Sequence, residues 1–159
     1  MSTRSNISVK IDPRDYGKTL RHNGNEEFYG EVKIPTENPD GMYLSIYHHH
    51  DGYPSGLGET LLNQYNTYEK ALDAVLGGDC SSLLDDNPRF YCEMGETFKS
   101  NKPRLTIDPE MNEEFAYKFE NGEWWWASCY DSDLGIWQKL KEIAVTDENE
   151  KYIVSTNYD

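Results

Sequence analysis

The sequence is short of cysteines, of cations and of long apolar runs. Its three cysteines, Cys80, Cys92 and Cys129, show no CxxC spacing, which is typical of free thiols in a reducing cytoplasm. No stretch approaches 18 consecutive apolar residues, so the sequence predicts no membrane span. The segment Met1–Asn6 lacks the apolar core of a secretory signal, and we therefore expect a cytoplasmic protein.

Acidic side chains outnumber the cations. Lys and Arg total 15 against 29 Asp and Glu, which gives a formal net charge of -14. This charge opposes contact with nucleic-acid phosphates and anionic lipid, so we expect neither nucleic acid nor membrane as a direct partner. Residues 107–159 hold 13 of the acids and four lysines, a net charge of -9. Such a surface attracts basic proteins, although acidity also serves plain solubility.

The pattern of apolar residues favours one mixed domain. Aromatic residues make up 13% of the 159 residues, enough to build a core for a single domain over residues 1–159. Period-two alternation is more frequent than helical periodicity, which indicates an α+β fold with a mostly antiparallel sheet and two or three helices. We expect strands over residues 7–11, 28–34, 41–48, 89–92 and 105–107. The turn sequence Asn38–Gly41 predicts that 28–34 and 41–48 form a hairpin.

The clearest helix follows Asn66, which is predicted to be its N-cap with Glu69 completing a capping box. Apolar residues recur at helical spacing from Tyr68 to Leu76, and Gly77-Gly78 supplies a left-handed stop. The other expected elements are a short helix from about Ser55, one turn at Ser81–Leu84, a last helix from Asp133 to Ala144 and a short strand at Tyr152–Val154.

A second hairpin is predicted near residue 120. Apolar residues alternate over Phe115–Phe119, Asn121-Gly122 is the favoured dipeptide of a type I′ turn, and Trp124–Trp126 returns. Alternate Trp residues are expected to be buried in the sheet, so Trp125 should face the opposite side. An exposed Trp at that position would be a binding anchor.

Three separate segments carry a family resemblance. They are Ser2–Ser5 (STRS), Tyr47–Gly58 (YHHHDGYPSGLG) and Gly78–Leu83 (GDCSSL). Together they resemble a family of small phage and prophage proteins of undefined biochemistry that carry STRS, YxHxDGYPxGxG and GDISSL-like segments. The motif positions fall here on Tyr47, His49, Asp51, Gly52, Tyr53, Pro54, Gly56 and Gly58. The resemblance covers roughly the first half of the chain, and it implies a mobile-element origin and action in the cytoplasm of a host cell.

The segment from His48 to Gly58 has two open interpretations. In the structural one, Asp51 caps a turn or the following helix and Tyr53 packs over it. In the functional one, His49, Asp51 and Tyr53 belong to a ligand or partner site, with backbone N–H groups able to hold an anion. A metal held by His48, His50 and Asp51 lacks any HExxH or CxxC support, and a Cys80–His49 nucleophile pair has no local support either. We expect no metal, no cofactor and no catalytic residues.

The charge and the resemblance together lead to one functional expectation. Phages use small acidic proteins to occupy the nucleic-acid-binding surfaces of host restriction enzymes and CRISPR effectors. We expect a non-enzymatic inhibitor whose partner is a host nucleic-acid-binding protein with a basic channel. Four expected contact residues flank the second hairpin, whose two ends would present them on one rim beside Tyr117 or Trp125: Glu113, Glu114, Glu120 and Glu123. Asp131 and Asp133 form a second acidic cluster among the expected contact residues. The alternative is a small-ligand-binding protein or metal-dependent enzyme centred on His48–Gly58.

Overall fold

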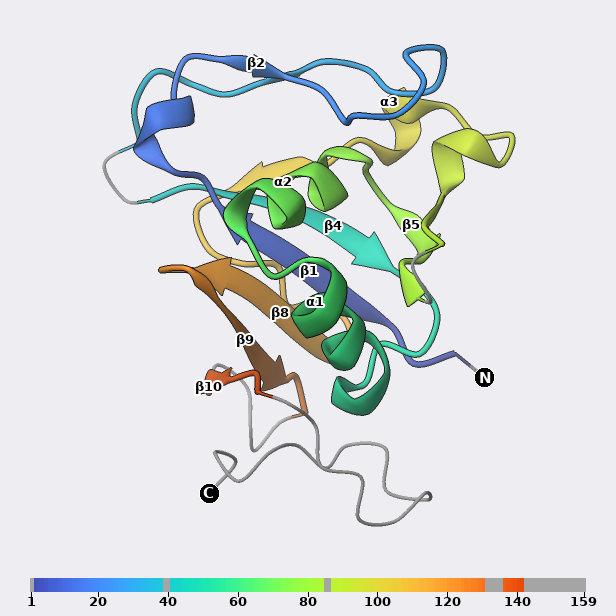
Figure 1. Ribbon diagram of the computed structural model, residues 1–159, viewed down its shortest axis with the longest axis vertical. Coiled ribbons are helices and arrows are strands. Elements are labelled where there is room, and N and C mark those ends of the chain that lie inside the picture. The colour runs from blue at the N-terminus through green and yellow to red at the C-terminus, as the bar shows by residue number, and fades with distance from the viewer. Residues whose placement is uncertain (1, 39–40, 85–86, 131–135, 142–159) are drawn as a thin grey trace.

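A mixed eight-stranded sheet forms the centre of the molecule (Figure 1). The structure, a computed structural model, describes residues 2–38, 41–84, 87–130 and 136–141. The strands of this sheet are β1 (Ser5–Lys10), β4 (Tyr43–His48), β5 (Cys80–Ser82), β6 (Arg89–Phe90), β7 (Arg104–Thr106), β8 (Phe115–Glu120), β9 (Glu123–Ser128) and β10 (Gln138–Lys139). A separate two-stranded sheet consists of β2 (Thr19–Leu20) and β3 (Val32–Lys33).

The strand order places the amino-terminal strand in the middle of the sheet. The order is β10-β9-β8-β1-β4-β5-β6, and β7 pairs with the first half of β4. Neighbouring strands are antiparallel except for the β1–β8 and β4–β5 pairs, which are parallel. The predicted α+β class with a mostly antiparallel sheet is therefore confirmed.

Helices α1 (Glu59–Gln64) and α2 (Tyr68–Leu76) cover one face of the sheet, and the single turn α3 (Phe98–Asn101) lies near its edge (Figure 1). Thr67 caps α2, because its hydroxyl accepts a hydrogen bond from the Lys70 N–H at 3.2 Å. The predicted cap at Asn66 is therefore wrong by one residue. The left-handed stop is confirmed at Gly78, whose φ is 86°.

The face of the sheet under the helices is apolar. Ile7 and Val9 of β1 and Leu44 and Ile46 of β4 are at most 1% exposed, and they alternate with polar neighbours as a half-covered sheet requires. Other members of this core are Leu57, Leu61, Ala71, Val75, Phe115, Tyr117, Phe119, Trp124 and Trp126. The prediction that Trp124 and Trp126 are buried in the sheet is confirmed.

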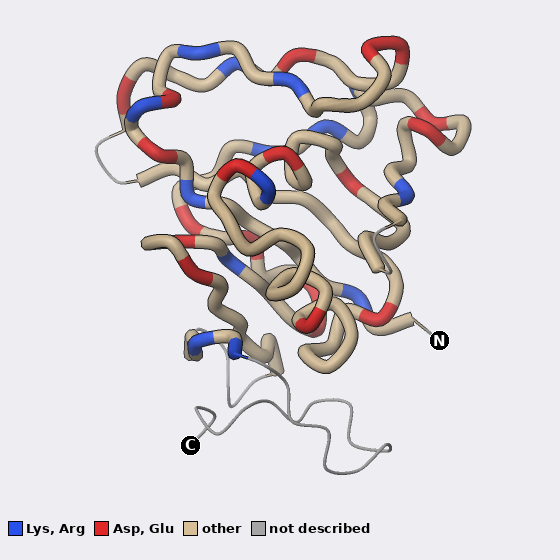
Figure 2. The backbone as a smooth tube through the Cα atoms, viewed as in Figure 1, with Lys and Arg blue, Asp and Glu red and all other residues tan. Residues whose placement is uncertain are grey.

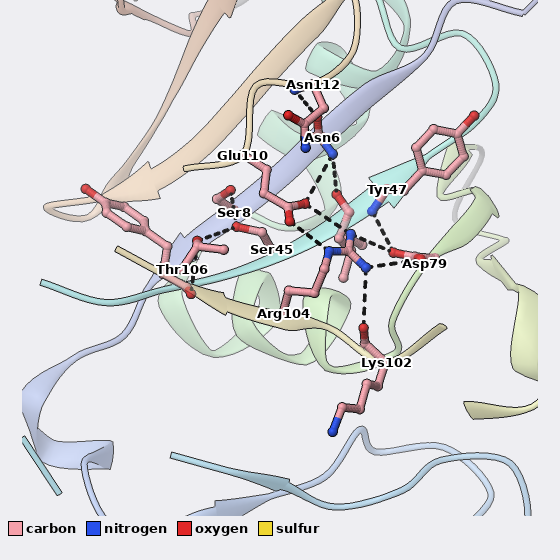
Figure 3. Close-up of polar contacts among 12 residues, drawn as sticks. Asn6, Ser8, Ser45, Tyr47, Asp79, Lys102, Arg104, Thr106, Glu110 and Asn112 are labelled. Atoms are coloured by element: carbon pink, nitrogen blue, oxygen red, sulfur yellow. Dashed lines mark hydrogen bonds and ion pairs between the residues drawn. The ribbon is translucent and has the colours of Figure 1, made fainter. Parts of the chain in front are cut away.

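The opposite face of the sheet is polar, yet its centre is also buried. The connection from β7 to β8 crosses this face, and the Asn112 N–H donates to the Asn6 side-chain oxygen at 2.9 Å (Figure 3). Under it, the Ser8 and Ser45 hydroxyls lie 2.7 Å apart, and Thr106 contacts Ser45 at 3.1 Å. The buried hydroxyls of Ser8 and Ser45 therefore each have a partner, as low polarity requires.

Two expected features of the first half of the chain are wrong. Residues 28–34 contain only the two-residue strand β3, because the Phe28 N–H turns back to the Asn25 carbonyl at 3.0 Å. The expected hairpin with β4 does not form, since one edge of β4 pairs with β1 and the other with β5 and β7. The expected turn at Ser81–Leu84 is likewise replaced by β5 over its first residues.

The last expected helix is also wrong where the structure describes it. Within residues 136–141, Gln138–Lys139 pairs with β9 as β10, and the Leu140 N–H donates to the Trp124 carbonyl at 2.9 Å. The open edge of β9 offers backbone partners that local periodicity cannot reveal. The rest of the expected helix and the Tyr152–Val154 strand lie outside the described residues. Over the described ranges, no helix has the length and apolarity needed to cross a membrane.

Candidate functional site

One end of the sheet brings together three segments: Ser2–Ser5, Tyr47–Gly58 and Gly78–Leu83. The Gly52 N–H donates to the Thr3 carbonyl at 2.8 Å, which joins the STRS segment to the DGYP turn. The N–H groups of His49 and His50 donate to the carbonyls of Cys80 and Ser81 at 3.2 and 3.0 Å. The site therefore brings together residues that are up to 80 positions apart in the sequence.

Gly52 is required at this junction. A Cβ atom at Gly52 would lie 2.6 Å from the Ser5 hydroxyl and 2.9 Å from the Thr3 carbonyl oxygen. The Tyr117 hydroxyl also donates to the Gly52 carbonyl at 2.7 Å, so the turn is fixed from the sheet below. Tyr117 is fully buried and burial raises its pKa. It is therefore part of the core, so the expected contact rim cannot lie beside an exposed Tyr117.

His48 is a buried structural residue. Its Nε2 accepts a hydrogen bond from the Leu83 N–H at 3.0 Å, so the imidazole is neutral with its proton on Nδ1. Burial, and secondarily the charges of His50 and His49, lower its pKa from 6.5 to about 3. Its side chain ties β4 to the end of β5 and does not point with His50 toward a common ligand.

His49 and His50 extend past the end of β4 toward solvent. The Tyr47 hydroxyl lies 2.6 Å from His49 Nδ1, and the Ser2 hydroxyl lies 3.0 Å from His50 Nδ1. Burial and the neighbouring charges of His50 and Arg4 lower the pKa of His49. Among the described residues, no three His, Cys, Asp or Glu side chains are grouped to hold a metal ion.

Asp51 contributes to the turn through its backbone conformation. It is exposed and has a φ of 50°, and its carboxylate accepts from the Tyr53 hydroxyl at 3.2 Å. Its carbonyl accepts from the Leu57 N–H at 3.0 Å. The helical turn at Pro54–Gly58 has no side-chain cap, so the expected helix cap at Asp51 is wrong, while the packing of Tyr53 against the Asp51 turn is confirmed. Gly56 permits this close turn, since a Cβ there would lie 2.6 Å from the Asp51 carbonyl oxygen.

A polar pocket opens beside this turn. Its volume is about 310 Å³, and its lining residues are His50, Asp51, Ser82, Leu84, Asn87 and Arg89. Cys80 is not part of it, since this side chain is fully buried and burial raises the pKa of its thiol well above the ordinary range. Cys80 meets His49 only through the backbone hydrogen bond, so the described residues contain no assembled Cys80–His49 nucleophile pair.

The four expected glutamates of the β8–β9 hairpin do not share one rim. Glu113 and Glu114 precede β8, whereas Glu120 and Glu123 are paired across the turn at its far end. Glu114 and Glu120 are six positions apart along extended strand, a distance of about 20 Å. The type I′ turn between the strands is confirmed by the φ values of 57° at Asn121 and 81° at Gly122.

The two glutamates at the turn are neutralised within the chain. Glu120 forms ion pairs with Lys118 at 3.2 Å and Lys10 at 3.6 Å, and it accepts from the Tyr43 hydroxyl at 2.6 Å. Burial alone would raise the pKa of Glu120, but these partners hold it below its ordinary value. Glu123 pairs with Lys139 at 3.5 Å.

Trp125 lies on the polar face, as predicted, and is half-buried there. The Lys118 and Lys139 ammonium groups lie 6.0 and 5.9 Å from its ring centre, and Lys118 also lies 4.7 Å from the ring of Trp137. Its indole N–H donates to the Glu120 carbonyl at 3.1 Å. Trp125 is therefore surrounded by cations of the chain itself. The expected contact residues Asp131 and Asp133 lie outside the described residues.

The polar face carries an ionic network that no sequence pattern predicted (Figure 3). Arg104 donates two hydrogen bonds to Glu110, at 2.8 and 3.0 Å, and two to Asp79, at 3.2 and 3.0 Å. Asp79 also accepts from the Tyr47 N–H at 2.8 Å. The network joins β7, the start of β5 and the crossing connection. Asp79 and Tyr47 lay in sequence motifs, but Arg104 and Glu110 did not, so no local signal identified these two partners.

The described part of the molecule is much less acidic than the whole chain (Figure 2). Ten of the 29 acids and one of the 15 cations fall outside the described residues, so the described residues carry 19 acids and 14 cations, a net charge of -5. Glu113 and Glu114 form no ion pair with any residue in these ranges.

Comparison of the chain with family models, with curated proteins and with solved structures finds no match in any of the three.

Proposed function

We propose that this protein is a non-enzymatic inhibitor that occupies the basic nucleic-acid-binding surface of a host defence enzyme, either a CRISPR effector or a restriction enzyme, in the host cytoplasm. The observation that carries the proposal is the net charge of -14, in which acids outnumber cations nearly two to one. Charge of one sign on a small protein speeds its encounter with a basic channel and makes that encounter sensitive to salt.

Glu113 and Glu114 are the described residues of the expected contact surface whose charges are not in ion pairs. Both are half-buried, and the Glu114 carboxylate accepts a hydrogen bond from the Arg4 backbone N–H at 3.2 Å. They have no ion-pair partner among the described residues, whereas Glu120 and Glu123 already have lysine partners. Carboxylates that are already paired gain little from a new cation, because the first partner screens their charge. The contact therefore centres on the start of β8 and not on the β8–β9 turn.

Order of addition tests the proposed mechanism. The purified protein is mixed with restriction enzymes and CRISPR effectors, and DNA cleavage is measured. Inhibition is expected when the protein is added before the nucleic acid, and protection of the enzyme is expected when its channel is already filled. Inhibition that is independent of this order would contradict occupation of the channel, and no inhibition across the panel would contradict the function.

The two ends of the hairpin provide matched variants. Glu113→Gln with Glu114→Gln should weaken inhibition severalfold, since each exposed pair contributes up to about 1 kcal/mol. Glu120→Gln with Glu123→Gln removes the same formal charge and should weaken it less, after correction for any loss of folding seen by circular dichroism. Equal effects of the two pairs would argue for total charge and against a local contact.

The pocket beside Asp51 supports a second candidate, a site for a small polar ligand. It is lined by His50, Asp51 and Arg89, where the three segments of the family resemblance meet. Activity of this kind should survive high salt and should be lost in His50→Ala or Asp51→Ala proteins that remain folded. Salt-sensitive activity with both variants fully active would remove this candidate.

A further inference from the structure

A second groove joins two loops that are far apart in the sequence. Its volume is about 550 Å³, and its lining residues are Glu26, Glu27, Phe28, Tyr29, Gly30, Cys92, Gly95, Glu96, Thr97 and Phe98. The first five precede β3 and the others surround the start of α3, and the acidic stretches of both loops lie at the same end of the molecule (Figure 2). The local sequence gave no sign of the groove, because its two sides are some 65 residues apart.

The two sides of the groove are built to fit each other. A Cβ at Gly30 would lie 2.7 Å from the Phe98 ring, so glycine is needed for the loops to meet. The Thr97 hydroxyl accepts from the Ser100 N–H at 3.2 Å and fixes the start of α3. Glu96 is oriented by the Asn101 side-chain amide at 3.1 Å.

The charge of the groove has one sign. Three of its lining residues are glutamates and none is Lys or Arg. Arg21 reaches only the outer carboxylate, Glu26, at 3.4 Å, and Glu27 has no ion-pair partner among the described residues. A positively charged group is therefore the complementary occupant.

Aromatic rings complete the groove. Phe28 is 38% exposed, which is high for so apolar a side chain, and Phe98 packs at the edge of the core. Tyr29, another lining residue, is only 2% exposed, and its hydroxyl has no hydrogen-bond partner among the described residues. Planar cations stack on aromatic faces, and a guanidinium also matches carboxylate geometry, which an ammonium does less well.

We propose that the groove lined by Glu26–Gly30 and by Cys92 and Gly95–Phe98, called here the acidic–aromatic groove, is the docking site for an arginine side chain of a basic partner protein. The guanidinium stacks on Phe28 and Phe98 and is neutralised by Glu27 and Glu96. The inference rests on the proposed function only in that both require a basic partner. It adds a second contact, separate from Glu113 and Glu114, and it assigns the side chain that this contact recognises.

A peptide titration tests the groove without any target enzyme. The ¹⁵N-labelled protein is titrated with acetyl-Gly-Arg-Gly-amide, with the lysine peptide and with the neutral citrulline peptide, and amide chemical shifts are followed. We expect shifts at residues 26–30 and 95–98, with binding strongest for arginine and weakest for citrulline. Glu27→Gln and Glu96→Gln should each weaken arginine binding about two- to fivefold, and Phe28→Ala should do so similarly. Glu59→Gln, with the same charge change at an exposed position outside the groove, should change it by less than about twofold.

Each failure has a separate meaning. Citrulline binding as well as arginine, shifts outside the two loops, or no effect of the Glu27 and Glu96 variants would overturn the groove as an arginine site. Lysine binding as well as arginine would overturn the stacking and bidentate pairing that the proposal assigns. If the peptide fails to bind while the protein still inhibits a defence enzyme, only the proposal that the groove binds arginine is contradicted. If the peptide binds but no enzyme is inhibited, the proposed function falls and the groove remains.

Discussion

Asp51 and His48 lie three residues apart, and they contribute to the stability of the fold through different physical effects. Asp51 is exposed and holds a left-handed backbone conformation, with a φ of 50°, that Asp tolerates better than most residues. His48 is fully buried, and its only hydrogen bond in the described structure requires the neutral ring. One residue therefore depends on backbone geometry and the other on protonation, and separate substitutions can test each.

The backbone of Asp51 is tested by comparing alanine with glycine. Alanine in the left-handed region costs about 1 kcal/mol or more, whereas glycine adopts it freely. We expect Asp51→Ala to lower the free energy of unfolding by about 1 kcal/mol and Asp51→Gly to change it by less than about 0.5 kcal/mol, measured by urea unfolding. Tyr53→Phe is the control for the lost hydrogen bond. Equal losses in both Asp51 variants would show that the carboxylate contact dominates.

The protonation of His48 predicts how stability depends on pH. The folded-state pKa of about 3 lies below the ordinary 6.5, so the unfolded chain binds the proton first. The stability contributed by the neutral ring is complete above pH 6.5 and is lost as the pH falls toward 3. Between pH 7 and pH 5 the wild type should lose about 2 kcal/mol from this group.

His48→Gln keeps an acceptor near Nε2 and removes the titration. The variant should lose less stability than the wild type between pH 7 and pH 5, as followed by urea unfolding at each pH. Carboxylates change little in this window, since their ordinary pKa values lie near 4. Parallel pH curves for the two proteins would disprove the assignment to His48.

Among the elements, those defined by local signals were predicted correctly and those defined by distant partners were not. The period of α2, its Gly78 stop and the Asn121-Gly122 turn are properties of a few consecutive residues. By contrast, β4 pairs with β1 across some 40 residues, and β10 takes its partners from the edge of β9. Local alternation of apolar residues indicates a strand but does not identify the strand it pairs with. The predictions of the first hairpin and of the last helix were wrong for this reason.

The same limit applies to the candidate site. The residues of the DGYP turn were identified from the sequence, but their meeting with Thr3 and Cys80 depends on sheet order. The expected glutamate rim failed because the length of β8 separates its two ends. The Arg104 network and the acidic–aromatic groove join loops that carry no shared sequence signal.

At the scale of elements, a comparison of two glycines distinguishes the cost of backbone strain from the cost of a steric clash. Gly78, at the end of α2, and Gly122, in the β8–β9 turn, have nearly equal φ values of 86° and 81°. A Cβ at Gly122 would meet nothing within 4 Å, whereas one at Gly78 would lie 2.3 Å from the Asn101 carbonyl oxygen. Gly122→Ala should cost about 1 kcal/mol of stability, and Gly78→Ala about 1–3 kcal/mol more. Thermal unfolding of both variants checks this, and equal costs would refute the packing contribution.

The distribution of charge is the main feature of the whole molecule. The described residues have a net charge of -5, against -14 for the full chain. Most of the charge that favours a basic partner therefore lies outside the described ranges, while the described surface offers local acidic contacts among many internal ion pairs.

This charge predicts that the protein does not bind duplex DNA. Non-specific binding needs cations to neutralise phosphates, and its usual dissociation constants at physiological salt are about 1–100 μM. We expect no shift of a duplex in gel electrophoresis up to about 100 μM protein at this salt concentration. A salt-dependent complex in the micromolar range would contradict a partner that is protein alone.

The central position of β1 has a consequence for synthesis of the chain. β1 leaves the ribosome well before its partner strand β8, because the parallel partner of Ser5 is Phe115, 110 residues later. At about 5–20 residues per second, roughly 6–22 seconds pass before β8 exists. During this interval one edge of β1 is unpaired and the apolar residues Ile7 and Val9 lack the finished sheet around them. The nascent chain is therefore a natural client for ribosome-associated chaperones, and fragments ending before residue 115 should be prone to aggregation.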